Sequence, residues 1–250
     1  MTEFVIVIPA RYASVRLPGK VLLEIAGKPM LQHVYERGKE SSAAQVVIAT
    51  DDRRIADAAK EFGATVCMTG KHHQSGTERI AEVADLLDWD DAQIVVNLQG
   101  DEPSMPAALI DQCAALLDDE NSDIATLASP FLNRDDFENP NYVKVICDDV
   151  GHAIYFSRAA IPYARDAQRL DLAMDAALHH HGMYAYRCGI LRRLVAAKPS
   201  SAEVSEQLEQ LRALSLGMSI AVGIPSRRPG IGVDTEDDLR RVAAELNSPD

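Results

Sequence analysis

The chain has 250 residues, 47% of them apolar and 25% charged, which is the composition of a globular protein with one sizeable core. Its formal net charge of −13 argues against nucleic acid or an anionic membrane surface as a partner, so an anionic substrate would need a local cluster of positive charge. No stretch approaches the roughly 20 apolar residues of a membrane span, and the first apolar run, ending at Pro9, is too short for a signal peptide.

Apolar runs alternate with amphipathic segments along the first 130 residues. Residues 4–8 (FVIVI) are a continuous β-branched run, which predicts a strand buried on both faces of a parallel sheet. The same reasoning predicts strands at 46–49, 65–68, 94–98 and 124–128 and helices at 29–39, 51–62, 75–87 and 106–117. This alternation predicts a doubly wound α/β sheet, in which ligands bind beyond the carboxyl ends of the strands.

The pattern loosens after residue 130, but no linker is long enough to separate two domains. Residues 142–147 and 152–156 predict a hairpin around a polar turn. Beyond it the sequence predicts a polar loop at 165–171, a strand at 183–187 and an amphipathic helix at 203–214. We therefore expect a single domain over residues 1–250.

The loop after the first strand carries the positive charge that an acidic protein needs for an anionic ligand. Within residues 9–20 it places a glycine next to three cations and a hydroxyl: Arg11, Arg16, Lys20 and Ser14. Triphosphates are bound by bidentate arginine contacts, a compact lysine charge, hydroxyls and backbone N–H groups. The loop matches neither the Walker pattern GxxxxGK[ST] nor the Rossmann pattern GxGxxG, and a solvated basic surface loop is the alternative interpretation.

Two acidic segments contain candidate metal ligands. Asp101 and Glu102 follow the predicted strand 94–98, and carboxylates together with phosphate oxygens are the ligands that Mg²⁺ prefers. A second acidic segment begins at Asp234. The alternatives are structural, because Asp101 or Glu102 could face the dipole of the next helix, and Asp234 or Thr235 could cap the last one.

The basic loop resembles the signature of sugar nucleotidyltransferases, and its sequence IPARYAS-RLPGK is similar to that of the CMP-Kdo synthetases, where Kdo is 3-deoxy-manno-octulosonate. Six further segments resemble the same family: H-SGT-R from His73, NLQGDEP from Asn97, YFSR--IP from Tyr155, H-G-Y-YR from His180, LEQLR from Leu208 and GVDT-EDL from Gly232. The matches run from residue 5 to about 240 and cover nearly the whole chain.

The resemblance implies the family's fold and activity. The implied fold is a single α/β domain with a Rossmann-like, doubly wound mixed sheet of the nucleotide-diphospho-sugar transferase type, plus a smaller sugar-binding and dimerisation lobe. Residues 1–130 would be the nucleotide-binding half, and residues 131–250 the sugar-binding and dimerisation part. The implied enzyme is a cytoplasmic homodimer that uses Mg²⁺ to transfer CMP from CTP to Kdo, releases pyrophosphate and serves lipopolysaccharide biosynthesis.

Carried over by position, the resemblance also implies roles for single residues. CTP would be bound by Arg11, Ser14, Arg16, Lys20, Ser75, Gly76 and Gln99. Mg²⁺ would be held by Asp101 and Asp234, which together with Arg11 and Lys20 would be the catalytic residues. Kdo would be bound by Arg79, Gln99, His180, Tyr184, Glu209 and Gln210. Gly70 and His72 stand where the family often has Arg and Asp, so Lys71 would supply a basic contact to the nucleotide instead.

Some of these segments have structural interpretations as well. Arg79 could form a salt bridge on a helix surface with Glu82, and Glu209 lies in an amphipathic helix. The three histidines at 179–181 suggest a zinc site, but side chains alternate between the faces of an extended segment, so all three cannot face one ion. The four cysteines are far apart and form no CxxC pair, which predicts free buried thiols in a reducing cytoplasm.

Overall fold

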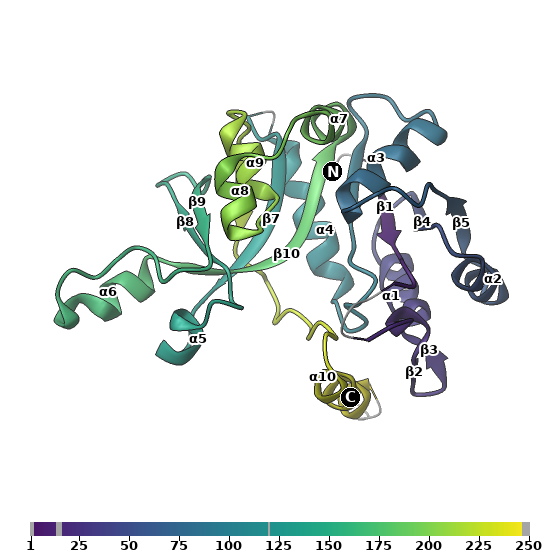
Figure 1. Ribbon diagram of the computed structural model, residues 1–250, viewed down its shortest axis with the longest axis horizontal. Coiled ribbons are helices and arrows are strands. Elements are labelled where there is room, and N and C mark those ends of the chain that lie inside the picture. Colours follow the sequence, from purple (N-terminus) through teal and green to yellow (C-terminus); the bar gives the residue numbers. More distant parts are fainter. Residues whose placement is uncertain (1–2, 14–16, 120, 247–250) are drawn as a thin grey trace.

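A mixed sheet forms the centre of the molecule (Figure 1). In the computed structural model, which describes residues 3–13, 17–119 and 121–246, this sheet has nine strands. Seven strands lie side by side in the order β11 (Ile220–Gly223), β7 (Ile124–Pro130), β10 (Leu178–Arg187), β6 (Ile94–Asn97), β1 (Phe4–Pro9), β4 (Gln45–Thr50) and β5 (Thr65–Met68). The remaining two form the hairpin of β8 (Lys144–Cys147) and β9 (Ala153–Ser157), which joins the sheet through β10.

The first half of the chain builds the parallel part of the sheet. Strand β1 pairs in parallel with β4 and β6, and β4 pairs in parallel with β5. Because side chains alternate along a strand, Val5 and Val7 belong to the core on one face, and Ile6 and Ile8 to the core on the other. Both faces of β1 are therefore apolar, and this is why its sequence is a continuous rather than an alternating apolar run.

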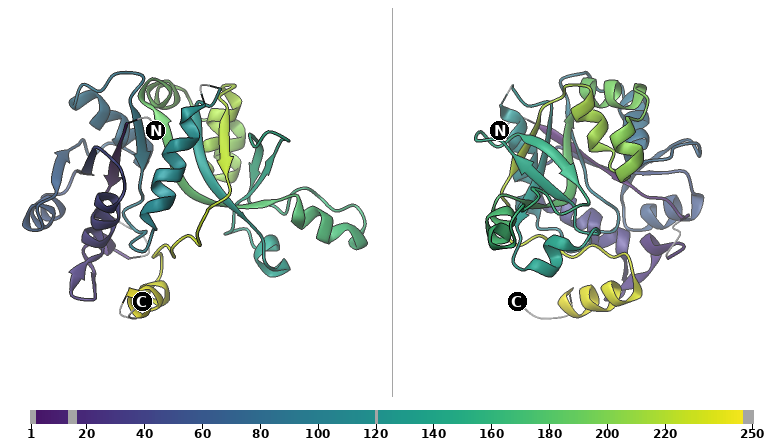
Figure 2. Two further views of the ribbon diagram at one scale, coloured as in Figure 1. Left: turned by 180° about the vertical axis from the view of Figure 1, so that it is seen from behind. Right: turned by 60° about the vertical axis from the view of Figure 1, so that its left-hand side comes forward.

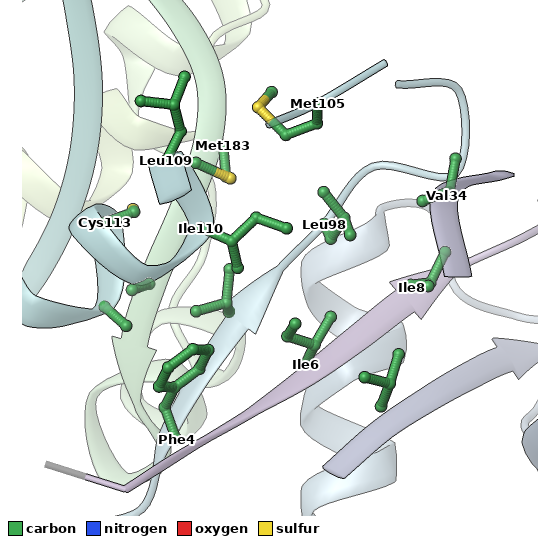
Figure 3. Packing of buried hydrophobic residues seen from close by; sticks show 14 of the residues in the cluster. Phe4, Ile6, Ile8, Val34, Leu98, Met105, Leu109, Ile110, Cys113 and Met183 are labelled. Atoms are coloured by element: carbon green, nitrogen blue, oxygen red, sulfur yellow. The ribbon is translucent and has the colours of Figure 1, made fainter. Parts of the chain in front are cut away.

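Helices cover both faces of this sheet. The core around Ile6 and Ile8 is completed by α1 (Met30–Glu40), α2 (Arg53–Glu61) and α4 (Ala107–Ala115). Figure 3 shows this core, where Phe4 and Ile6 of β1 lie on the side of Ile110 of α4, and Ile8 lies beside Val34 of α1. The opposite core is completed by α3 (Gly76–Leu86), α7 (Cys188–Ala196) and α9 (Gln210–Ser215). The doubly wound arrangement predicted from the first 130 residues is confirmed.

The second half of the chain adds the antiparallel strands. Strand β10 runs antiparallel to β6 and β7, whereas β11 is parallel to β7, so the sheet is mixed as expected. The predicted strand at 183–187 is confirmed as the end of β10, which begins earlier than predicted, at Leu178, where Leu178 and His179 pair with both β7 and β8. The predicted hairpin is confirmed as β8 and β9.

Residues 131–177 project from the sheet as an arm (Figures 1 and 2). The arm contains α5 (Arg134–Glu138), the β8–β9 hairpin and α6 (Leu170–Asp175), and it has a small apolar core of Phe131, Phe137, Ala173 and Ala177. The end of the predicted loop at 165–171 is therefore wrong, because α6 already begins at Leu170. The tertiary contacts of Leu170 and Ala173 with the arm's core stabilise a helix that its polar composition did not indicate.

The predicted helix 203–214 is two helices, α8 (Ser201–Glu206) and α9, joined at a sharp break. Gln207 adopts a left-handed conformation with φ 52°, which ends α8. A buried ion pair holds the two helices together, since Nε of Arg212 in α9 donates to Oε2 of Glu203 in α8 over 2.8 Å. The break makes Glu209 the N-cap residue of α9 rather than a residue in the middle of a helix.

The C-terminal helix α10 (Glu236–Leu246) lies beside the N-terminal half of the chain (Figure 2). It packs on the small hairpin of β2 (Glu24–Ile25) and β3 (Lys28–Pro29), and Ile25, Val233 and Val242 form a separate apolar cluster there. This packing brings residues near 234 next to the loop that precedes β2. No helix in the described parts of the chain is long and apolar enough to cross a membrane.

Candidate active site

A cavity of about 410 Å³ opens at the carboxyl ends of β1 and β6. This first cavity is lined by the loop after β1, the N-terminus of α3, the turn after β6 and the segment before α10, through Arg11, Lys20, Ser75, Gly76, Arg79, Gln99, Asp101 and Asp234 among others. Its position agrees with the rule that ligands bind beyond the carboxyl ends of the strands. Ser14 and Arg16, two of the predicted phosphate ligands, lie outside the described residues.

Lys20 lies between two carboxylates in the first cavity. Its Nζ is 2.5 Å from Oδ2 of Asp101 and 3.2 Å from Oδ1 of Asp234, and it also donates to the carbonyl of Val233 over 3.1 Å. Gly19 positions Lys20, because its φ of 71° turns the chain and a Cβ there would meet the Tyr12 ring at 3.0 Å. Burial lowers the pKa of Lys20, but the two carboxylates outweigh this effect and raise it above its ordinary value.

Asp101 and Asp234 come from distant parts of the sequence, and both turn towards the cavity. The N–H of Val233 donates to the carbonyl of Asp101 over 2.8 Å, which ties the two acidic segments together. Thr235 makes a helix-cap hydrogen bond at the start of α10, since its Oγ1 accepts from the N–H of Asp238 over 3.2 Å. Asp101 is not at a helix N-terminus, because α4 begins six residues later at Ala107.

Glu102 is not among the described residues that line the first cavity. Its Oε2 is buried and makes no hydrogen bond within the described part of the chain, although other atoms of the residue reach the surface. Burial, together with the neighbouring charge of Asp101, raises the pKa of Glu102 to about 8. Asp101 is therefore the member of this acidic pair that lines the first cavity.

The N-terminus of α3 forms another wall of the first cavity. Oγ of Ser75 caps the helix by accepting from the N–H of Glu78 over 3.2 Å. Gly76 permits a close approach to β1, because a Cβ there would lie 3.2 Å from the ring of Pro9. Free N–H groups and the helix dipole favour an anion at this place. Arg11 adds a cation nearby, and its Nη1 donates to the carbonyl of Gln74 over 3.3 Å.

Arg79 is buried on α3 and lines the first cavity. Its Nη2 is 3.2 Å from Oδ1 of Asp51, and its Nη1 donates to Thr69. Burial lowers the pKa of Arg79, which Asp51 partly offsets. The surface salt bridge with Glu82 is absent from these contacts, because Glu82 instead binds Nε2 of His73 at 2.5 Å and the N–H of Gly70 at 2.8 Å.

A second cavity, of about 130 Å³, adjoins the first. The two share Gly76 and Gln99, and the second is lined mainly by neutral polar and apolar side chains: Thr77, Asn97, Ile124, Tyr184, Tyr186, Leu194, Gln210 and Ala213. Its charged lining residue is Glu209, whose Oε2 accepts a hydrogen bond from Thr77. No lysine, arginine or histidine is among its described lining residues.

Known proteins resemble this chain in sequence and in fold. The sequence profile of the cytidylyltransferases matches residues 5–220. The chain belongs to the cytidylyltransferase family. A solved structure of CMP:2-keto-3-deoxy-manno-octonic acid synthetase complexed with CTP is 40% identical, has a TM-score of 0.89 and matches 98% of both chains.

Two more distant structures share the fold. A cytidylyltransferase from Leptospira borgpetersenii is 18% identical with a TM-score of 0.63, over 97% of this chain and 86% of that one. The 4-diphosphocytidyl-2C-methyl-D-erythritol synthase from Anaerococcus prevotii is 13% identical with a TM-score of 0.64, over 98% and 99% of the two chains. At these identities the likeness establishes the architecture of the sheet and its helices. These two structures do not identify the substrate of this chain.

The predicted sugar residues of this cytidylyltransferase do not all meet at one cavity. Gln99, Tyr184, Glu209 and Gln210 line the second cavity, whereas Arg79 lines the first. His180 lies behind the second cavity, where its ring packs 5.2 Å from that of Tyr184 and its Nε2 is 3.0 Å from Oγ1 of Thr126. Burial lowers the pKa of His180 to about 3, so the imidazole is neutral.

Three polar lining residues of the second cavity were not predicted from the sequence as site residues: Thr77, Asn97 and Tyr186. Signals for all three were present. Asn97 opens the NLQGDEP segment, and Thr77 is the threonine of the H-SGT-R segment. Tyr186 is two residues beyond Tyr184, which puts both tyrosines on one face of a strand. The contact of Thr77 with Glu209, 132 positions away, is visible only in the structure.

Lys71, the expected substitute for a missing family arginine, lines a third cavity of about 280 Å³ on the far side of Arg11 and Arg79. Arg54 closes part of this space, with its guanidinium 3.3 Å from the centre of the Tyr12 ring. The third cavity shares Arg11 and Arg79 with the first, so the two cavities adjoin. A role for Lys71 towards the nucleotide stays a prediction.

The remaining candidate ligands lie apart from these cavities. The rings of His179 and His181 pack against each other with centroids 4.8 Å apart, whereas the ring of His180 packs against Phe156. Nε2 of His181 is 2.7 Å from Oγ of Ser129. Among the residues that the structure describes, no group of three or more His, Cys, Asp or Glu side chains could hold a metal ion. The four cysteines are free thiols; two of them are buried and two partly buried.

Proposed function

We propose that this cytidylyltransferase transfers CMP from CTP to Kdo and releases pyrophosphate, and that it thereby activates Kdo for lipopolysaccharide biosynthesis. The observation that carries the proposal is a cation-lined cavity, with Lys20 between two carboxylates, that shares a wall with a cavity suited to a neutral polyol. The similarity to a CTP-bound synthetase of CMP-2-keto-3-deoxy-manno-octonic acid over 98% of the chain supports this assignment.

The proposed reaction takes place where the two cavities meet, with CTP in the first and the sugar in the second. The anomeric oxygen of the sugar attacks the α-phosphorus of CTP, a new phosphorus–oxygen bond forms, the bond to the β-phosphate oxygen breaks, and the anomeric hydroxyl loses its proton. Little covalent chemistry falls to the protein, so positioning and charge neutralisation supply most of the rate. Lys20, Arg11 and the N-terminus of α3 would neutralise the triphosphate and the departing pyrophosphate.

We infer the orientation of the sugar from the side chains that line the second cavity. Kdo has a carboxylate beside its anomeric carbon and several hydroxyls along its chain. The second cavity has no cation among its described lining residues, so the hydroxylated chain would point into it. The carboxylate and the anomeric carbon would then lie at the shared wall by Gln99, close to the positive charge of the first cavity. This orientation also brings the attacking oxygen nearest to the phosphates.

Asp101 and Asp234 would hold Mg²⁺. The fit is good because two hard carboxylate ligands already converge on a single cation, the ammonium of Lys20, and Mg²⁺ commonly takes one or two carboxylates plus phosphate oxygens. When bound, Mg²⁺ would supply Lewis-acid stabilisation of the phosphate charge. The Lys20 ammonium would then turn towards the phosphates. Among the described lining residues, Asp101 and Asp234 are the carboxylates that could accept the proton of the anomeric hydroxyl.

The proposed enzyme is a cytoplasmic homodimer. Residues 1–130 would supply most of the nucleotide site, and residues 131–250 would supply the sugar site and the dimer contact. The division is not strict, since Asp234 from the second part lines the first cavity. The arm carries exposed apolar side chains of the kind that a partner subunit would cover, among them Leu132, Tyr163 and Leu172.

The test is an assay of pyrophosphate release by the wild-type protein with Mg²⁺. CTP with Kdo should be turned over, whereas UTP or ATP with Kdo should give little product. Sialic acid should be disfavoured against Kdo by about 100-fold or more, the scale expected for a site that hydrogen-bonds particular hydroxyls. Equal use of sialic acid would overturn the assignment of Kdo, and equal use of UTP would overturn that of CTP.

A further inference from the structure

Asn97 is a buried polar residue whose hydrogen bonding is incomplete. It is the last residue of β6 and is 2% exposed. Its Oδ1 is buried and has no hydrogen-bond partner among the described residues. Buried carbonyl oxygens are nearly always paired, because an unmade hydrogen bond leaves the full cost of removing the group from water. An unpaired oxygen that lines a cavity therefore indicates a missing donor in that cavity.

The neighbouring strand presents a second group of the same kind. Tyr184 of β10 is the cross-strand partner of Asn97 in the antiparallel pairing of β6 with β10, so both side chains lie on the same face of the sheet. The hydroxyl of Tyr184 is buried and also lacks a partner in the described parts of the structure. Both residues line the second cavity. The adjacent strands β6 and β10 thus place an unpaired acceptor, on Asn97, and an unpaired hydroxyl, on Tyr184, at the wall of the second cavity.

The rest of the cavity indicates what would satisfy these groups. Glu209 and Gln210 enter from the N-terminus of α9, and no cation is among the described lining residues. A carboxylate in this position would meet no positive charge, and an apolar ligand would leave both orphan groups unpaired. A chain of neutral hydroxyls can donate to Asn97 and Glu209 and accept from Tyr184 at the same time.

We propose that Asn97 is a specificity-determining residue, and that its Oδ1 accepts a hydrogen bond from one hydroxyl of the sugar chain, next to the hydroxyl bound by Tyr184. The assignment rests on the proposed function, in which the polyol part of Kdo occupies the second cavity. It separates Asn97 from Gln99, which lies two residues further on and lines both cavities at their shared wall.

The experiment compares the wild-type enzyme with Asn97→Leu, which keeps the approximate volume and removes the amide. Steady-state constants are measured for CTP, for Kdo and for a series of Kdo analogues that each lack one chain hydroxyl. Asn97→Leu should lower kcat/KM for Kdo by about 30-fold or more, within the range for a lost hydroxyl contact, while the KM for CTP changes less than about twofold. One deoxy analogue should be poor for the wild type, yet equal to Kdo for the variant.

The controls separate contact from folding. Ser122→Ala removes the hydroxyl of another buried residue that lies outside the second cavity, and it should leave the preference among the analogues unchanged. If Asn97→Leu fails to fold, the smaller Asn97→Ala should show the same loss of preference. A variant that discriminates among all analogues as the wild type does would overturn the role of Asn97. A wild-type enzyme that does not use Kdo would instead overturn the proposed function, and this assignment with it.

Discussion

At the scale of single residues, Lys20 links the two acidic segments that line the first cavity. Its ammonium contacts both Asp101 and Asp234, which are 133 positions apart in the sequence. Two carboxylates this close to one point repel each other unless a cation lies between them. In this structure Lys20 supplies that cation, and in the working enzyme the substrate-bound state would share the role between Lys20 and Mg²⁺.

Replacing either carboxylate should therefore remove catalysis while the fold persists. We expect Asp101→Asn and Asp234→Asn each to lower turnover by at least about 100-fold, the scale of losing one group that stabilises transition-state charge. Circular dichroism should show an unchanged fold, and added Mg²⁺ should not restore the rate. Near-normal turnover in a folded Asp234→Asn variant would contradict the role of Asp234.

Lys20→Ala should act on the nucleotide rather than on the sugar. Lys20 lines the first cavity and not the second, so its loss should raise the KM for CTP much more than the KM for Kdo. Measurement of both constants at saturating co-substrate checks this expectation. A rise confined to the KM for Kdo would mean that the two cavities have been assigned the wrong way round.

Thr77 fixes the orientation of Glu209, because its hydroxyl donates to Oε2 of that carboxylate. Thr77→Val keeps the shape of the side chain and removes the donor, so the KM for Kdo should rise by about 5- to 10-fold, in line with about 1–1.5 kcal/mol for one hydrogen bond. Thr77→Ser keeps the hydroxyl and should restore the wild-type KM. If valine and serine behave alike, Thr77 does not position Glu209.

At the scale of elements, the run of three histidines in β10 affects how the stability of the protein depends on pH. The strand is partly buried between β6 and β7, and burial lowers the pKa of His180 to about 3 and that of His181 to about 4. Both imidazoles are therefore neutral in the folded protein at pH values where an unfolded chain, with a pKa near 6.5, would bind protons.

This difference makes stability depend on pH in a defined direction. Between about pH 6.5 and pH 4 the unfolded chain binds more protons than the folded one, so the free energy of unfolding should fall as the pH falls, by about 1.4 kcal/mol per pH unit for each histidine. Denaturant titrations at pH 7, 6 and 5 measure the slope. His180→Gln should flatten it, and an unchanged slope in that variant would rule out His180 as a source.

The break between α8 and α9 shows how an element boundary builds a site. No glycine or proline lies between Ser201 and Ser215, so the sequence predicts one continuous helix there. The left-handed Gln207 and the buried Glu203–Arg212 pair turn the chain instead, and the turn directs Glu209 into the second cavity. Glu209 was a candidate from the sequence and lines the second cavity, whereas the backbone turn that directs it there was not predicted.

At the scale of the whole molecule, the arm is too small to be a separate domain and too apolar to be an ordinary surface feature. Leu132 is 92% exposed, Tyr163 86% and Leu172 66%, and all three lie on the arm. We expect the protein to be a homodimer in solution through this surface, as measured by sedimentation or light scattering. Leu132→Ser combined with Leu172→Ser should shift the equilibrium towards monomer, and an unchanged dimer would place the contact elsewhere.

The sequence alone determined the parts that depend on local pattern. β-Branched runs and amphipathic segments predicted five strands and four helices of the first 130 residues to within a few positions, because alternating or helical burial imposes its period on the sequence; the short strands β2 and β3 were not predicted. The loop of Lys20 and the acidic segments of Asp101 and Asp234 were recognisable as candidates, because phosphate and cation chemistry requires those residue types.

Only the tertiary structure decided which candidates meet. The contact of Lys20 with Asp234 requires α10 to pack on β2 and β3. Arg79 is separated from Glu209 because Thr77, which contacts Glu209, and Arg79 point in different directions from α3 and line different cavities. The unpaired oxygen of Asn97 is likewise invisible in sequence, since a polar atom is orphaned only by everything that packs around it. These are properties of residues far apart in the chain, and no local period encodes them.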